Sequence, residues 1–174
     1  MKKISGLLIL ILAFAFNISA QQIDKNKKIP SAEIKTLENL NFNTSEISNN
    51  QKPIVISFWA TWCKPCVTEL NTMAELYSEW TEATGVKIIA VSIDDARNMA
   101  KVAPFVSGKG WEYDIYIDPN GDFKRAMNVN AIPHTFLVNH DLEIVWQHNS
   151  YAPGDEYKLY ENIEKLAKGI PLAD

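Results

Sequence analysis

The chain has 174 residues, of which 47% are hydrophobic and 22% are charged, and this composition is typical of one globular domain and excludes a disordered chain. Its formal net charge of −4 provides no basic excess for nucleic acid, so we predict no nucleic-acid partner. It contains only two cysteines, which excludes a small scaffold held together by several disulfides.

The first twenty residues have the three parts of a secretory signal peptide. A basic start at Met1–Lys3 precedes a wholly apolar run over residues 7–16, and small residues follow up to Ala20. A membrane-spanning helix needs roughly 20 apolar residues, so the alternative of an uncleaved anchor is less favoured. We predict a signal peptide over residues 1–20 and a mature chain over 21–174 with no membrane span. Export predicts a periplasmic location, where a cysteine pair normally forms a disulfide.

The first half of the mature chain predicts a hairpin, a buried strand and a helix. Residues 32–37 alternate loosely between polar and apolar side chains, as a half-buried strand does, and residues 41–43 are its expected partner. Residues 54–60 form a nearly continuous apolar run, which is typical of a central strand buried on both faces. Apolar residues at helical spacing after Cys66 predict a helix that ends at Gly85.

The second half alternates strands and helices. Its predicted elements are a buried strand over residues 86–93, a helix capped by Asp94 and Asp95 that runs to about Ser107, a strand over 113–117, a turn over 118–121, a short helix over 123–127, strands over 135–138 and 143–148, and a last helix that starts near 153–155. This order predicts an α/β fold, in which helices cover both faces of a central sheet and a hairpin adds antiparallel pairing at its edge. No segment is long enough to be a linker, so the mature chain is predicted to be one domain.

The two cysteines, Cys63 and Cys66, lie between the strand over 54–60 and the helix that follows it. Residues three apart at a helix start are about 60° apart around the axis, close enough for a disulfide. Free N–H groups and positive partial charge in the first turn favour a thiolate at Cys63. Lys64 adds a neighbouring positive charge, and Pro65 suits a first turn because it has no N–H to donate.

This arrangement predicts thiol–disulfide exchange, in which Cys63 attacks a substrate disulfide and Cys66 resolves the mixed disulfide. Two structural alternatives remain. A zinc site needs four ligands, so the three histidines at His134, His140 and His148 would have to supply the rest. A purely structural disulfide would close only a tiny loop and would stabilise the chain little.

Residues 58–66, Phe-Trp-Ala-Thr-Trp-Cys-Lys-Pro-Cys, resemble the active site of the thioredoxin superfamily. The segments over residues 91–94, 118–121 and 132–138, with the signal peptide and the N-terminal hairpin, resemble its exported TlpA/ResA-like branch. The resemblance covers essentially all of the mature chain. It implies a thioredoxin-like fold: a mixed central sheet flanked by helices, with an N-terminal β-hairpin and a βα insertion.

The resemblance also implies a cis peptide bond before Pro133, which would face the cysteines. A cis proline would expose the backbone of Ile132 to an extended substrate, so Ile132 and Pro133 are implied substrate-docking positions. Trp62 directly precedes Cys63 and is expected to shape the docking surface.

The sequence departs from the thioredoxin pattern at two positions. Thioredoxins proper carry a buried aspartate where this chain has Ser57, and in the ResA-like branch a glutamate in the place of Glu69 is the proposed proton shuttle. Burial would raise the pKa of Glu69 toward neutrality, whereas a solvated helix glutamate would have no such role. His134 stands where the family often has threonine, and it either tunes the Cys63 thiolate or points into solvent.

We therefore predict an exported thiol-disulfide oxidoreductase that reduces disulfides in protein substrates. The resemblance implies a membrane protein that transfers thiol electrons as its donor, with no metal and no organic cofactor beyond the Cys63–Cys66 pair. Three alternatives remain: a disulfide-forming oxidant on the same fold, a Cu(I) carrier using Cys63, Cys66 and His134, and a peroxidase. A peroxidase needs an arginine beside its cysteine, and Arg97 and Arg125 are both distant in sequence.

Overall fold

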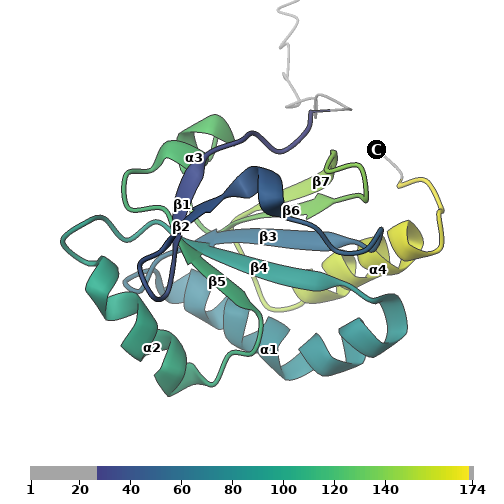
Figure 1. The fold of residues 1–174 in the computed structure, drawn as a ribbon. Coiled ribbons are helices and arrows are strands. Elements are labelled where there is room, and N and C mark those ends of the chain that lie inside the picture. Colours follow the sequence, from purple (N-terminus) through teal and green to yellow (C-terminus); the bar gives the residue numbers. More distant parts are fainter. Residues whose placement is uncertain (1–26, 173–174) are drawn as a thin grey trace, which may run out of the picture.

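The computed structural model describes residues 27–172, which form one α/β unit (Figure 1). Its strands are β1 (Glu33–Thr36), β2 (Asn41–Asn43), β3 (Ile54–Trp59), β4 (Lys87–Ser92), β5 (Asp114–Ile117), β6 (His134–Val138) and β7 (Ile144–Asn149), and its α-helices are α1 (Lys64–Thr84), α2 (Val102–Lys109), α3 (Asp122–Ala126) and α4 (Asp155–Ala167). The predicted signal peptide lies outside the described residues. Within residues 27–172, no helix combines the length and apolar character that crossing a bilayer requires.

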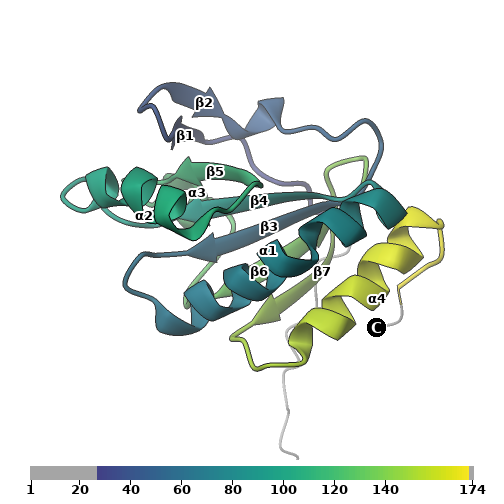
Figure 2. The same cartoon turned by 90° about the horizontal axis from the view of Figure 1, so that it is seen from below.

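The seven strands form one mixed sheet in the order β2-β1-β5-β4-β3-β6-β7. Strands β3, β4 and β5 are parallel, whereas β6 and β7 add antiparallel pairs on one side and the β1–β2 hairpin adds them on the other. Helices α1 and α4 lie along one face of this sheet, and α3 lies beyond the other (Figures 1 and 2). The predicted thioredoxin-like architecture, a mixed central sheet flanked by helices, is confirmed.

Strand β3 supplies side chains to both layers of the core, which explains its nearly continuous apolar sequence. Ile54, Ile56 and Phe58 pack into the cluster on the side of α3, and Val55 and Trp59 pack into the cluster on the side of α1. Ser57 lies between Val55 and Trp59 in the alternation of the strand, so its polar side chain also points toward α1. Every residue of β3 is buried, so the hydroxyl of Ser57 needs an internal partner.

The helix predicted to start at Asp94 and Asp95 begins later, and the prediction for Asp94 is wrong. A 3₁₀ turn over Met99–Lys101 leads into α2 at Val102. Asp95 closes the turn before it, because Asp95 Oδ1 accepts a hydrogen bond from the backbone N–H of Asn98 at 3.1 Å. Asp94 instead directs its carboxylate toward the loop that carries the cysteines.

Candidate functional site

The cysteine pair lies where β3 ends and α1 begins. Cys63 is the N-cap residue of α1, and Pro65 follows in the first turn. Cys63 and Cys66 form a disulfide with their Cα atoms 5.3 Å apart. The backbone N–H of Cys66 also donates to Cys63 Sγ at 3.4 Å, so the first turn of the helix faces that sulfur. A sulfur in this position is stabilised as a thiolate once the disulfide is reduced.

The two cysteines differ in exposure. Cys63 retains 6% of its surface, whereas Cys66 is completely buried. This difference in exposure favours Cys63 as the cysteine that meets a substrate disulfide and Cys66 as the cysteine that resolves it, which is the predicted order.

The predicted docking residues lie around the outer cysteine. Trp62 is 67% exposed and directly precedes Cys63. His134 pairs with Phe58 at the end of β3, so the residues just before β6, Ile132 and Pro133, lie at the same edge of the sheet as the cysteine loop. The peptide bond between Ile132 and Pro133 is cis. Pro133 is buried, while Ile132 is half-buried and retains accessible surface for a partner.

Two charged or titratable neighbours of the cysteines were expected to tune them. Lys64 is exposed, so water screens its charge. His134 is buried and not directed into solvent: its ring stacks on Phe136 at 4.2 Å between centroids, and its Nε2 is hydrogen-bonded to Gln147 Oε1 at 3.1 Å. Burial lowers the pKa of His134. Phe136 belongs to the core cluster on the α3 side, whereas both cysteines belong to the α1-side cluster. His134 is thus engaged away from the sulfur atoms.

The remaining histidines do not join the cysteines either. His140 pairs with Asp141 at 3.2 Å in the turn between β6 and β7, and His148 pairs with Asp155 at 3.2 Å. Within residues 27–172, no group of three or more histidine, cysteine, aspartate or glutamate side chains is placed to hold a metal ion. These residues therefore do not bring together the cysteine and histidine ligands considered above for a zinc site, or Cys63, Cys66 and His134 for a Cu(I) site.

Asp94 anchors the loop before the cysteines, a role that sequence reasoning missed. Its buried carboxylate accepts the backbone N–H of Thr61 at 2.8 Å and the hydroxyl of Thr61 at 2.7 Å. The hydroxyl of Ser92 donates to it at 2.7 Å. These three bonds fasten the segment between β3 and Cys63 to the end of β4.

Replacing Asp94 with alanine is expected to lower the free energy of unfolding by about 3 kcal/mol, because buried donors on Thr61 and Ser92 lose a charged acceptor. Urea unfolding followed by tryptophan fluorescence measures this loss. Asp114→Ala is the matched control, since its carboxylate meets Lys87 at 3.4 Å on the surface, and a change below about 1 kcal/mol is expected there. Equal losses in the two variants would show that Asp94 is no special anchor.

Glu69 lies one turn after Cys66 on α1, and it is buried with only 3% of its surface exposed. Thr135 Oγ1 donates to Glu69 Oε1 at 2.8 Å, and Ser57 Oγ donates to Glu69 Oε2 at 3.4 Å. Burial raises the pKa of Glu69 from 4.5 to about 7, although both hydrogen bonds oppose the shift. The alternative of a solvated helix glutamate is wrong. At neutral pH this carboxyl group can both accept and release a proton.

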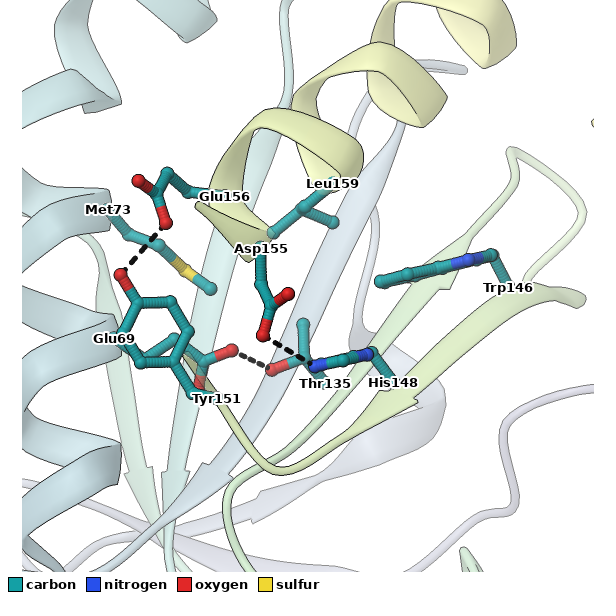
Figure 3. A pocket seen from close by; sticks show the side chains of 9 residues that line it. All are labelled: Glu69, Met73, Thr135, Trp146, His148, Tyr151, Asp155, Glu156 and Leu159. Carbon is teal, nitrogen blue, oxygen red and sulfur yellow. Dashed lines mark hydrogen bonds and ion pairs between the residues drawn. The ribbon is translucent and has the colours of Figure 1, made fainter. Parts of the chain in front are cut away.

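A small pocket lies on the far side of Glu69 from its helix (Figure 3). It is lined by side chains from α1, β6, β7 and the start of α4: Glu69, Met73, Thr135, Trp146, His148, Tyr151, Asp155, Glu156 and Leu159. The sequence offered little sign of this pocket, because its lining comes from segments up to about ninety residues apart.

A model of the AhpC/TSA family matches residues 26–147 of the chain. Among curated proteins, the thiol-disulfide oxidoreductase ResA of Oceanobacillus iheyensis is 32% identical over 148 residues, covering 80% of this chain and 76% of ResA. Both matches span the cysteine pair and Glu69.

Solved structures show the same fold. A thioredoxin-like protein from Porphyromonas gingivalis is 45% identical, with a TM-score of 0.73 over 80% of this chain and 92% of its own. A putative thiol:disulfide interchange protein DsbE from Chlorobium tepidum has a TM-score of 0.72 over 84% of this chain and 99% of its own, at 23% identity. The second likeness shows the fold alone.

Proposed function

The chain belongs to the AhpC/TSA family of thioredoxin-like proteins, and from this premise we propose that it is exported to the periplasm and reduces disulfide bonds of other proteins there. That it is a thiol-disulfide oxidoreductase follows from its relationship to ResA together with its cysteine pair. The observation that carries the proposal is the layered order of the site, in which an accessible Cys63, a buried Cys66 and a buried acid follow one another along α1.

In the proposed reaction, the reduced protein supplies two electrons from its two thiols. The Cys63 thiolate attacks a substrate disulfide, forms a mixed disulfide and releases the first substrate thiolate, which takes a proton from water. Glu69 then removes the proton of the Cys66 thiol, and the Cys66 thiolate attacks Cys63 Sγ. The Cys63–Cys66 disulfide forms and the second substrate sulfur leaves as a thiolate, which takes a proton from water, while the proton from Cys66 stays on Glu69. One disulfide has then been exchanged for another.

The partners follow from this chemistry. Trp62, Ile132 and Pro133 would border the substrate peptide, because they lie at the edge of the sheet where Cys63 retains 6% of its surface. An oxidising compartment cannot regenerate the dithiol, so the proposed reductase needs an electron donor, which we assign to a membrane protein that passes thiol electrons outward. The disulfide itself is the redox group, and no organic cofactor or metal is required.

The geometry favours this function over a peroxidase. Arg125 lies on α3 and pairs with Asp122 at 2.6 Å, on the side of the sheet away from the cysteines. Arg97 lies in the exposed turn before α2. The Arg125 guanidinium is therefore not placed to polarise a peroxide at Cys63, and the Arg97 side chain faces solvent.

The reduction potential of the Cys63–Cys66 pair tests the proposed direction. Purified protein is equilibrated with defined dithiothreitol and glutathione buffers, and the dithiol fraction is counted after alkylation. We expect a midpoint well below about −220 mV, as for a donor of electrons. A midpoint near about −120 mV would identify a disulfide-forming oxidant, and the reductive proposal would be abandoned. Cys66→Ala is the control, because it cannot form the internal disulfide.

A further inference from the structure

The proton handled by Glu69 needs a way out of the protein. Glu69 is 3% exposed and Cys66 is completely buried, so neither group exchanges protons directly with water. A docked substrate would cover the Cys63 side as well. Because each turnover of the proposed function loads one proton onto Glu69, a second route must connect this carboxyl group with solvent.

The pocket behind Glu69 supplies such a route. Thr135, which bonds Glu69, is the cross-strand partner of His148 on β7, so the two side chains lie on the same face of the sheet. Asp155, the first residue of α4, also lines the pocket, and its Oδ2 lies 3.2 Å from His148 Nε2. The side chains of His148 and Asp155 are 31% and 39% exposed. Figure 3 shows this pair facing Glu69 and Thr135 across the pocket.

The pocket has room for a proton carrier between its two ends. The space open to a water-sized sphere is about 10 Å³, which is about the minimum for one water molecule. Glu69 and Thr135 are among the residues that line it at the buried end, and His148 and Asp155 are among those that line it at the exposed end. A single bridging water suffices to pass a proton between side chains that do not touch.

We propose that the His148–Asp155 pair is the solvent end of the proton path of Glu69, and that both residues act as positioning residues through that carboxyl group. This inference rests on the proposed role of Glu69. The proton that Glu69 takes from Cys66 crosses the pocket, rests on the imidazole of His148 beside the Asp155 carboxylate, and leaves to bulk water. No electron moves in this step, and each turnover releases one proton by this route.

The tyrosines around Glu69 are poorly suited to the task. They are Tyr113 beside β5 and Tyr151 in the loop after β7, and the nearby Glu156 on α4 already accepts hydrogen bonds from Tyr151 and from the backbone N–H of Gly154. The Tyr113 hydroxyl donates to the carbonyl of Leu70 at 3.0 Å, and burial raises the pKa of Tyr113 far above neutrality. The Tyr151 hydroxyl is bonded to Glu156 at 2.9 Å, and burial also raises the pKa of Tyr151.

The chemistry of the two side chains also supports His148 and Asp155 as the solvent end of the proton path. Burial is the main cause that raises the pKa of Glu69, and the negative charge of Asp155 across the pocket adds a smaller contribution in the same direction. Histidine is the side chain whose ordinary pKa lies nearest to neutral pH, so it can take and release a proton on each turnover. An aspartate 3.2 Å from its Nε2 holds the ring in one orientation.

The test follows the two steps of exchange separately in His148→Gln. Reduced protein is mixed with a synthetic peptide that carries one disulfide, samples are quenched with acid, and the mixed disulfide is counted by mass spectrometry. In dilute buffer at pH 6, Glu69 starts mostly protonated and must lose that proton before it can accept another from Cys66. Under these conditions we expect normal formation of the mixed disulfide and a roughly 10-fold slower resolution by Cys66. Free imidazole in the buffer should restore the resolution rate, because a small carrier can replace the missing relay. Asp155→Asn should show the same pattern more weakly.

His140→Gln is the matched control, because His140 also pairs with an aspartate at 3.2 Å but lies in the turn between β6 and β7. It should behave as the unaltered protein. Normal resolution in both His148→Gln and Asp155→Asn, or slow resolution that imidazole leaves unchanged, would overturn the relay. Glu69→Gln, run in parallel, separates the two ideas: if it too resolves at the normal rate, the role of Glu69 itself fails, and if only Glu69→Gln is slow, the relay alone fails.

Discussion

Replacing Cys66 with alanine is expected to hold the protein on its substrate, whereas replacing Cys63 with alanine is expected to abolish exchange. Cys63 is the cysteine that retains accessible surface, so without it no thiolate meets a substrate disulfide. Without Cys66, the mixed disulfide at Cys63 has no internal thiol to resolve it. Removing the first sulfur therefore prevents the mixed disulfide from forming, whereas removing the second prevents it from being resolved.

Both variants can be examined with one gel. Reduced protein is incubated with a protein that contains a disulfide, free thiols are blocked, and the products are separated without reductant. Cys66→Ala should give a covalent complex that disappears on reduction, while Cys63→Ala should give none and leave the substrate oxidised. Lys64→Ala is the control for disturbance of the helix start, because its exposed side chain should leave the exchange intact. Full activity in Cys63→Ala would contradict the whole assignment.

The parts of the site that depend on local sequence could be predicted. The strand–Cys–x–x–Cys–helix order places both cysteines by helix geometry alone, and Pro65 confirms the first turn. The position of Glu69 on the same helix also follows from residue spacing. The burial of Glu69 could not be predicted from spacing, because Thr135 on β6 and the start of α4 complete it, and both lie far along the chain.

Two residues show where local reasoning fails. Asp94 has the sequence context of a helix cap, yet its carboxylate bonds to Thr61, which is thirty-three residues away. His134 follows a proline beside the docking edge, but alternation along β6 directs its ring to the opposite face from Thr135. Which of two alternating faces is turned toward a helix depends on strand register, and register is a property of the assembled sheet.

The burial of Glu69 has a consequence for stability that depends on pH. Its pKa is about 7 in the folded protein, against 4.5 for the solvated group, so the folded state binds the proton more tightly. The resulting stabilisation is fully present below pH 4.5 and is lost as the pH rises to about 7. Above that range, the ionised carboxylate destabilises the fold by about 3 kcal/mol relative to its protonated form. Glu69→Gln keeps a similar shape and an acceptor for Thr135 but carries no titrating proton.

Glu69→Gln is therefore expected to alter both stability and rate. The difference in unfolding free energy between the original protein and Glu69→Gln should change by about 3 kcal/mol between pH 4.5 and pH 8, and urea titrations across this range measure it. The resolution of the mixed disulfide by Cys66 should slow about 100-fold and lose its inflection near pH 7, since no base accepts the thiol proton. Glu75→Gln, on the exposed face of the same helix, is the control and should change neither curve. If Glu69→Gln alters stability with pH but leaves the pH–rate profile intact, the buried acid is structural and the Cys66 proton leaves by another group.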